Sequence, residues 1–357
     1  MNPLPYNTNL PVNLLASVFN RTTATYKFYW FISILEILAE KPNKLDIPIR
    51  SILTRMICNA WYPVHYFKIS FGVSDRLRQN IIEIQKHTEI PFDASKEKIN
   101  QILTNTIENR ILNLVLHFNK CVPYRFLSPW FPKTNDRDVV KFSSKFLNRC
   151  LYKIDLLTEK IQINPDWENY LIANNKILKD FCYWNLIQYL QTKNSNVPNI
   201  ANKLIKPITR DSMVQQRKYW DLVFNSSKNI NCIYTREVLS SSDYALEHFI
   251  PWSFVSHNLI WNIVPVTRSV NSSKSNRLPD INHFFEPFVN VQKKAIQTVW
   301  RLQPRNKILE DYLVLGETIP IVANMPMPEF QIKYQKLIMP LIQIAENMGF
   351  EYWKDNT

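Results

Sequence analysis

Glycine is scarce in this sequence of 357 residues, which contains only Gly72, Gly316 and Gly349. A glycine-rich phosphate loop and a dinucleotide-binding fingerprint each need several glycines close together. The scarcity therefore excludes protein kinases, P-loop NTPases and Rossmann dehydrogenases.

Paired cysteines are also missing, because the five cysteines lie far apart and no CxxC pair occurs. Neither a structural zinc site nor a disulfide framework is expected, so hydrophobic packing must brace the core. The N-terminal stretch MNPLPYNTNLPVN has neither the basic nor the apolar region of a signal peptide. Together these features predict a cytoplasmic protein.

Long hydrophobic runs and an excess of acidic residues are absent as well. The most apolar early run, FYWFISILEILA at 28–39, is interrupted by Glu36 and is too short to span a bilayer, so it predicts a buried helix and no membrane partner. Lys and Arg number 43 against 30 Asp and Glu, which gives a formal charge of +13. This balance favours a polyanionic partner, most simply nucleic acid, with an anionic membrane surface as the other reading.

The apolar periodicity predicts a mainly α-helical protein with short strands in its C-terminal half. Proline-bearing aromatic segments at 60–72 and 122–133 are expected to be ordered connections or short strands. An Asn- and Pro-rich stretch at 193–207 is the candidate domain boundary. We expect a helical domain over 1–200, a small module over 201–285 and C-terminal helices over 286–357 that pack on it. The expected helices are 107–118 (with a cap at Asp93 or Ser95), 166–191, 209–225, 269–276, 285–302 and 328–347, and the expected strands are 231–239, 244–249 and 262–267.

The candidate catalytic residues lie in one stretch of the sequence, LEHFIPWSFVSHNLIWNIVPVTRSVNSSKSNRLP, residues 246–279. Glu247 and His248 are followed by Asn262, then by Asn271 nine residues later, then by Lys274. This order strongly resembles the HNH endonuclease motif, a ββα-metal fold with an acid-His-x-x-Pro run, a central Asn and an Asn-x-x-Lys-Ser helix. The likeness covers about residues 230–280 and is greatest to the HNH domains of RNA-guided CRISPR effector nucleases and of bacterial restriction and defence proteins.

The resemblance implies a role for each of these residues. The residue at the position of His248 is the general base that activates water, and an imidazole is largely unprotonated near neutral pH. Oxygen atoms of Glu247 and Asn271 are expected to hold Mg²⁺, for which Mn²⁺ can substitute. Asn262 is expected to pin the loop that carries His248, and Lys274 to contact a phosphate. Aspartate is common at the position of Glu247, so a glutamate here departs from the usual pattern.

Other residues of the motif region have two readings each. His257 either approaches the scissile phosphate or is an ordinary loop histidine. Arg268 and Arg277 either bind backbone phosphates or belong to a solvated basic face. The aromatic residues Trp252, Phe254 and Trp261 are expected in the core rather than as platforms for nucleic-acid bases.

The sequence therefore predicts an Mg²⁺-dependent HNH endonuclease that hydrolyses DNA, in restriction or anti-phage defence. One HNH site cuts one strand, so a double-strand break would need a homodimer or two successive nicks. A defence-system partner protein is a further expectation. The alternatives are a catalytically silent nucleic-acid-binding subunit of a defence complex, and an HNH nuclease that acts on RNA.

Overall fold

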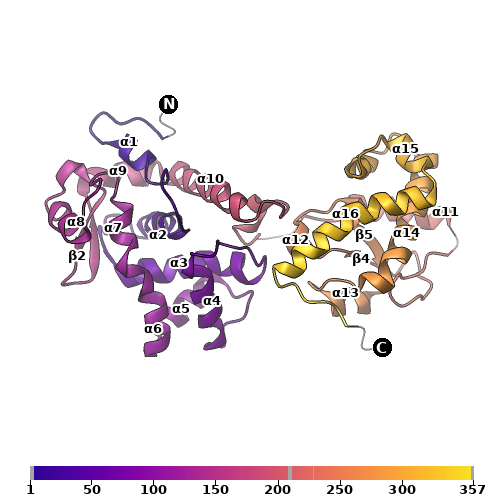
Figure 1. The fold of residues 1–357 in the computed structure, drawn as a ribbon, viewed down its shortest axis with the longest axis horizontal. Helices are drawn as coiled ribbons and strands as arrows, with labels where there is room; N and C mark the ends of the chain where they lie inside the picture. The colour runs from indigo at the N-terminus through magenta and orange to yellow at the C-terminus, as the bar shows by residue number, and fades with distance from the viewer. Residues whose placement is uncertain (1–3, 208–210, 228, 355–357) are drawn as a thin grey trace. The chain divides into compact units, whose positions relative to one another are not determined.

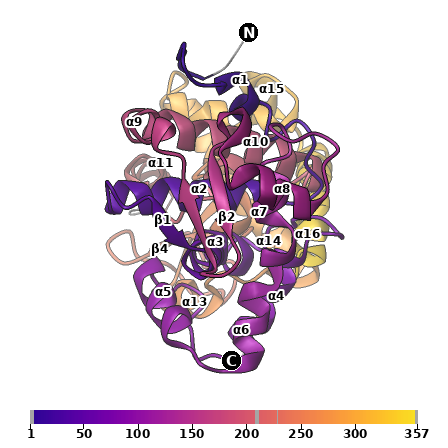
Figure 2. The same cartoon turned by 90° about the vertical axis from the view of Figure 1, so that its left-hand side faces the viewer.

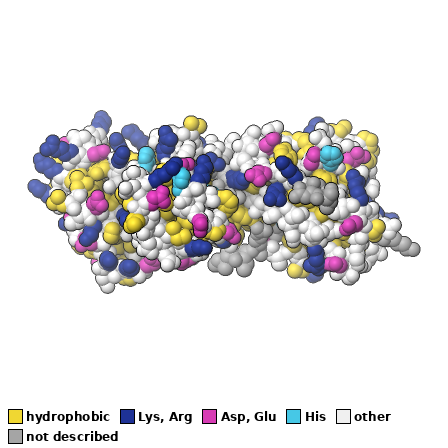
Figure 3. All heavy atoms as spheres, turned by 90° about the horizontal axis from the view of Figure 1, so that it is seen from below, with side chains coloured by type: hydrophobic (Ala, Val, Ile, Leu, Met, Phe, Trp, Pro, Cys, Tyr) yellow, Lys and Arg dark blue, Asp and Glu magenta, His cyan; other side chains and the backbone are white. Residues whose placement is uncertain are grey.

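The computed structural model describes residues 4–207, 211–227 and 229–354. The chain divides into two compact units (Figure 1). The N-terminal unit comprises Met1–Ser195 and Lys203–Lys206, and the C-terminal unit comprises Asn196–Asn202 and Pro207–Thr357. On the face shown in Figure 3, Lys and Arg side chains lie over both units.

The N-terminal unit is a cluster of helices around α2. Every residue of α2 from Phe28 to Leu35 is buried, which is the pattern of a helix enclosed on all sides. The helix α3 lies between α2 and the group α4, α5 and α6 (Figure 1, Figure 2). The prediction of a buried helix at 28–39 is confirmed. The helices are α1 (Val12–Ala16), α2 (Tyr26–Glu40), α3 (Ile49–His65), α4 (Arg76–Lys86), α5 (Lys96–Asn105), α6 (Asn109–Leu116), α7 (Val122–Phe126), α8 (Asp136–Ser143), α9 (Pro165–Ala173) and α10 (Asn175–Lys193), with 3₁₀ turns η1 (His117–Lys120) and η2 (Leu147–Arg149).

A small antiparallel sheet completes this unit. Its strands are β1 (Asp46–Pro48), β2 (Tyr152–Asp155) and β3 (Lys160–Ile163), in the order β1-β3-β2. Ile161 of β3 stands opposite both Ile47 and Ile154, so three branched apolar side chains meet across the sheet.

The C-terminal unit is built around the long helix α14, which contacts α11, α15, α16 and β5. The predictions of strands near 244–249 and 262–267, and of helices near 269–276, 285–302 and 328–347, are confirmed. Of the predicted helix 209–225, residues 209 and 210 lie outside the described part, and the helix begins at Val214. The elements are α11 (Val214–Ser226), β4 (Ala245–His248), α12 (Trp252–Val255), η4 (Ile260–Asn262), β5 (Ile263–Val266), α13 (Arg268–Lys274), α14 (Ile281–Leu302), η5 (Lys307–Leu315), α15 (Ile319–Asn324) and α16 (Met327–Asn347), with η3 (Ile200–Lys203) at the unit boundary.

The expectation for the two proline-bearing segments is wrong in part. Helix α3 continues through Pro63 to His65, and α7 begins one residue before Pro123. Pro123 stands in the first turn of α7, where a missing N–H costs no hydrogen bond. Pro63 lies in the last turn of α3 and is buried, so packing of this apolar turn outweighs the lost backbone bond.

Three other predicted elements also need correction. The helix expected over 107–118 is α6, which starts at Asn109, while Ser95 caps a separate helix, α5. The helix expected over 166–191 is divided at Asn174 into α9 and α10. The expected strand at 231–239 is only an isolated bridge between Asn231 and Val238. Within the described residues, no helix is both long and apolar enough to cross a membrane.

Candidate active site

The hairpin of β4 and β5 carries the acid and the histidine of the motif. Glu247 stands opposite Val264, and His248 stands opposite Ile263. All four residues of β5 are buried, so the hairpin is held by packing on both faces. The amide of Gln292 on α14 donates to the carbonyls of Ile260 and Ile263, at 3.2 and 2.8 Å, and ties the hairpin to this helix.

Asn262 fixes the chain that follows His248. Its side chain is fully buried, its Oδ1 accepts from the backbone N–H of Ile250 at 2.8 Å, and its Nδ2 donates to the carbonyl of the same residue at 2.9 Å. The carbonyl of Asn262 also accepts from the N–H of Phe249 at 2.8 Å. The bond to Phe249 continues the register of β4 and β5, and the two side-chain bonds hold Ile250 just before Pro251, which has no N–H to donate.

Helix α13 packs against β4 and presents Asn271 and Lys274 from one face. Thr267 caps its start, with Oγ1 accepting from the N–H of Val270 at 3.4 Å. The ammonium of Lys274 is fully buried and lies 2.6 Å from Oε1 of Glu247, and it also donates to the carbonyl of His248 at 3.0 Å. Lys274 therefore does not reach a surface where it could contact phosphate, and its structural partner is the motif's own acid.

His248 is oriented from two directions. Its Nε2 lies 3.0 Å from Oδ1 of Asn258, and the backbone of His257 also hydrogen-bonds the ring. Asn258 is itself held, because its Nδ2 donates to the carbonyl of Asp211 at 3.1 Å and its carbonyl accepts from Gln216 at 2.6 Å. The ring is thus fixed by the connection between β4 and β5, which Asp211 and Gln216 hold in turn.

Burial dominates the protonation of His248. It lowers the pKa to about 4; the bond to Asn258 opposes this shift, while the charges of Lys274 and His257 add to it. The imidazole is therefore neutral at physiological pH, the form in which one ring nitrogen can accept a proton.

A cavity of about 420 Å³ brings the chemical groups together. Glu247, His248 and Asn271 all line it, whereas Asn262 and Lys274 do not. Motif spacing did not indicate Asn258, although it lies within the motif stretch, nor Asp211, which belongs to a separate segment; the other lining residues come from these same two parts of the chain. Those other residues are Ser212, Met213, Leu246, Trp252, Ser275 and Asn276.

The remaining residues predicted from the motif lie outside this cavity. Arg268 is exposed and pairs with Asp243 at 2.5 Å, and Arg277 is exposed and donates to the carbonyl of Ser273 at 3.1 Å. His257 is partly buried, and its ring lies beside Trp261, with 5.4 Å between centroids. Trp261 and Phe254 are core residues as expected, whereas Trp252 is only partly buried and lines the cavity.

The cavity can be tested for its fit to a divalent metal ion. Within the described residues, no group of three or more His, Cys, Asp or Glu side chains could hold a metal. A carboxylate from Glu247 and an amide oxygen from Asn271 line the same cavity, however. A hard cation such as Mg²⁺ binds oxygen, and it keeps several waters when few protein groups hold it. The donor set therefore fits a hydrated Mg²⁺ and does not fit zinc.

A two-stranded hairpin followed by a helix, with an acid, a neutral histidine and an amide around one cavity, is the arrangement of a ββα-metal nuclease. Residues 232–280 match the family model of HNH endonucleases, so this segment is an HNH endonuclease domain. Such domains are hydrolases that bind nucleic acid and generally use a divalent metal. The match is to the family in general and does not single out the CRISPR effectors. No curated protein and no solved structure matches the chain.

Proposed function

We propose that the protein is an Mg²⁺-dependent endonuclease that hydrolyses DNA phosphodiester bonds in the cavity of the C-terminal unit. The observation that carries the proposal is the convergence of Glu247, His248 and Asn271 on that one cavity. DNA as substrate is supported by the formal charge of +13, and a role in restriction or anti-phage defence rests on the sequence resemblance alone.

In this mechanism His248 accepts a proton from the attacking water. Oδ1 of Asn258 lies 3.0 Å from Nε2 and can only accept, so Nε2 carries the hydrogen in this contact and can act as the base only after the attacking water replaces the amide. The carbonyl group of Ile250 is held by Asn262, which keeps the turn after His248 in place during this exchange. A positioned base of this kind accelerates hydrolysis by about 10²–10⁴-fold.

Glu247 and Asn271 would hold the metal, which supplies Lewis-acid stabilisation of the charge that develops on the phosphate. Lys274 acts through Glu247: with its ammonium 2.6 Å from Oε1, it fixes the carboxylate in the wall of the cavity. The position of the Glu247 carboxylate is thus set before any ligand arrives, which lowers the cost of organising the site.

The test is cleavage of supercoiled plasmid by the full-length protein with Mg²⁺, with EDTA, and with two histidine variants. We expect nicked circles with Mg²⁺, none with EDTA, and a loss of about 10²-fold or more for His248→Ala. His283→Ala is the matched control, because His283 is 75% exposed, pairs with Asp280 and does not line the cavity.

Each other outcome has a defined meaning. Equal nicking by the wild type and His248→Ala would overturn the mechanism. Cleavage of RNA alone would overturn the substrate while retaining the site. Binding of plasmid without cleavage under any metal would favour the silent-subunit alternative. Because one site cuts one strand, nicked circles are expected to precede linear DNA unless the protein is a dimer, which light scattering detects.

A further inference from the structure

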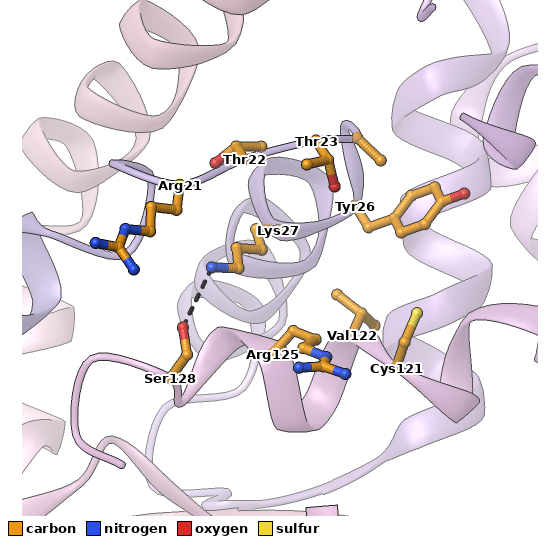
Figure 4. Close-up of a pocket in the computed structure, with 10 residues that line it drawn as sticks. Arg21, Thr22, Thr23, Tyr26, Lys27, Cys121, Val122, Arg125 and Ser128 are labelled. Carbon is orange, nitrogen blue, oxygen red and sulfur yellow. Dashed lines mark hydrogen bonds between the residues drawn. The ribbon is translucent and has the colours of Figure 1, made fainter. Parts of the chain in front are cut away.

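A second cavity, of about 450 Å³, lies in the N-terminal unit, which no family match covers. It is formed by the segment before α2, the first turn of α2, and the chain around α7 (Figure 4). Arg21, Lys27 and Arg125 contribute positive charges to its wall, and no Asp or Glu lines it. The other lining residues are Thr22, Thr23, Ala24, Tyr26, Cys121, Val122 and Ser128.

The three cations have no acidic partner among the residues that the structure describes. Arg21 and Arg125 are exposed and form no ion pair there, while Lys27 is partly buried. Burial lowers the pKa of Lys27, and the charge of Arg125 lowers it further. Lys27 and Arg125 therefore repel each other inside a concave site, and a bound anion would relieve that repulsion.

The donors of Lys27 are only partly used. An ammonium carries three N–H donors. Within the described residues, Lys27 Nζ donates to the carbonyl of Val18 at 3.0 Å and to Oγ of Ser128 at 3.4 Å, the bond drawn in Figure 4. The hydroxyl groups of Thr22, Thr23 and Ser128 add further polar atoms to the wall.

The start of α2 adds a second positive element. Tyr26 and Lys27 are the first residues of this fifteen-residue helix, and its first turn contains no acid. The helix dipole therefore places partial positive charge at the cavity. The carboxylate of Asp75 adjoins Thr25 but does not line the cavity, and its oxygens accept from the N–H and Oγ1 of Thr25 and from the N–H of Leu77.

We propose that this cavity binds a small phosphorylated molecule of nucleotide size, held by Arg21, Lys27 and Arg125. A cavity of this volume is in the range of small-molecule sites. The partly exposed ring of Tyr26 gives the ligand an apolar wall beside the cations. Arginine suits two-point recognition of phosphate, and a partly buried lysine supplies a point charge at depth. The site lies in the unit that does not contain the HNH motif.

The experiment is titration calorimetry of the full-length protein with inorganic phosphate, AMP, ATP, adenosine and a twelve-nucleotide single strand. We expect saturable binding of AMP or ATP, and at least tenfold weaker binding of adenosine, which has no phosphate. Arg125→Gln should weaken nucleotide binding by about tenfold to a hundredfold, because one charged hydrogen-bonding group is lost. Lys27→Gln should act in the same direction.

Arg137→Gln is the matched control, because Arg137 is an exposed arginine of the same unit and does not line the cavity. It should bind the nucleotide as the wild type does. The proposal is overturned if none of the phosphorylated probes binds, if adenosine binds as well as AMP, or if Arg125→Gln and Arg137→Gln have equal effects. Binding of the single strand alone, weakened by Arg125→Gln, would identify a nucleic-acid contact and overturn the small-molecule site.

Discussion

The two cavities of this protein differ in how their charged side chains are paired. In the C-terminal unit, Lys274 stands 2.6 Å from Glu247, and His248 is neutral because it is buried. In the N-terminal unit, Arg21, Lys27 and Arg125 line a cavity without any acid. The buried carboxylate of the first cavity is compensated by a lysine, whereas the three cations of the second have no acid among the lining residues.

This difference separates two ways of preparing a site. A buried ion pair fixes the position of a functional carboxylate, at the cost of making each partner depend on the other. In a cluster of like charges, no member depends on a partner within the fold, because the partly exposed side chains are solvated. The members repel one another, however, and a ligand of opposite charge can relieve that repulsion. Removal of one cation should therefore change the stability of the two units differently.

The largest effect is expected from Lys274→Met. This change leaves the Glu247 carboxylate, only 5% exposed, without its counter-charge. Breaking a buried pair from one side costs about 3–5 kcal/mol of the free energy of unfolding. Hydrogen exchange of the amides in β4 and β5 measures this loss locally. The double variant Lys274→Met/Glu247→Leu should recover most of it. A single variant that loses less than about 1 kcal/mol would contradict the importance of the pair.

The same pair marks a limit of prediction from the sequence. The resemblance of Glu247, His248 and Asn271 to the HNH motif implied a hairpin and a helix that converge, and the apolar pattern predicted these strands and this helix themselves. The spacing also puts Lys274 on the face of Asn271, but it cannot say whether a long side chain turns outward to phosphate or inward to Glu247. That choice depends on the packing of α13 against β4.

Contacts between distant segments are the other part that the sequence did not reveal. Asn258 bonds both His248 and the backbone of Asp211, forty-seven residues earlier in the chain. The cavity of the N-terminal unit joins residues 21–27 to residues 121–128. No periodicity or motif links such segments, so they become visible only once the helices have packed. The proline rule failed at Pro63 for the same reason, since a general preference yielded to tertiary contacts.

The second largest effect is a dependence of the stability of the C-terminal unit on pH, which arises from His248. The pKa of His248 is about 4 in the folded protein against 6.5 for an ordinary histidine. Between these values the unfolded chain binds a proton that the folded one does not, so stability is present above pH 6.5 and is lost as the pH falls toward 4. At 1.36 kcal/mol per pKa unit, the loss is roughly 3 kcal/mol.

Hydrogen exchange of β4 and β5 from pH 7 to pH 4, in the wild type and in His248→Gln, isolates this effect. The wild type should lose stability more steeply than the variant across that window. The subtraction is needed because the pKa of His65, in the N-terminal unit, is also lowered to about 4 by burial. Parallel pH profiles for the two proteins would mean that His248 is not held neutral by its burial.

The smallest effect, and the one with the opposite sign, is expected from Arg125→Gln. Arg125 is exposed and repels Lys27, so removing its charge relieves repulsion and breaks no ion pair among the described residues. Without ligand, thermal unfolding should show a stability unchanged or raised by about 0–1 kcal/mol, since exposed charges interact weakly. High salt should erase the difference from the wild type by screening the repulsion. Arg137→Gln, tested alongside, should show no salt-dependent gain. A loss above about 1 kcal/mol for Arg125→Gln would mean that this guanidinium is compensated within the fold after all, and the contrast between the two cavities would disappear.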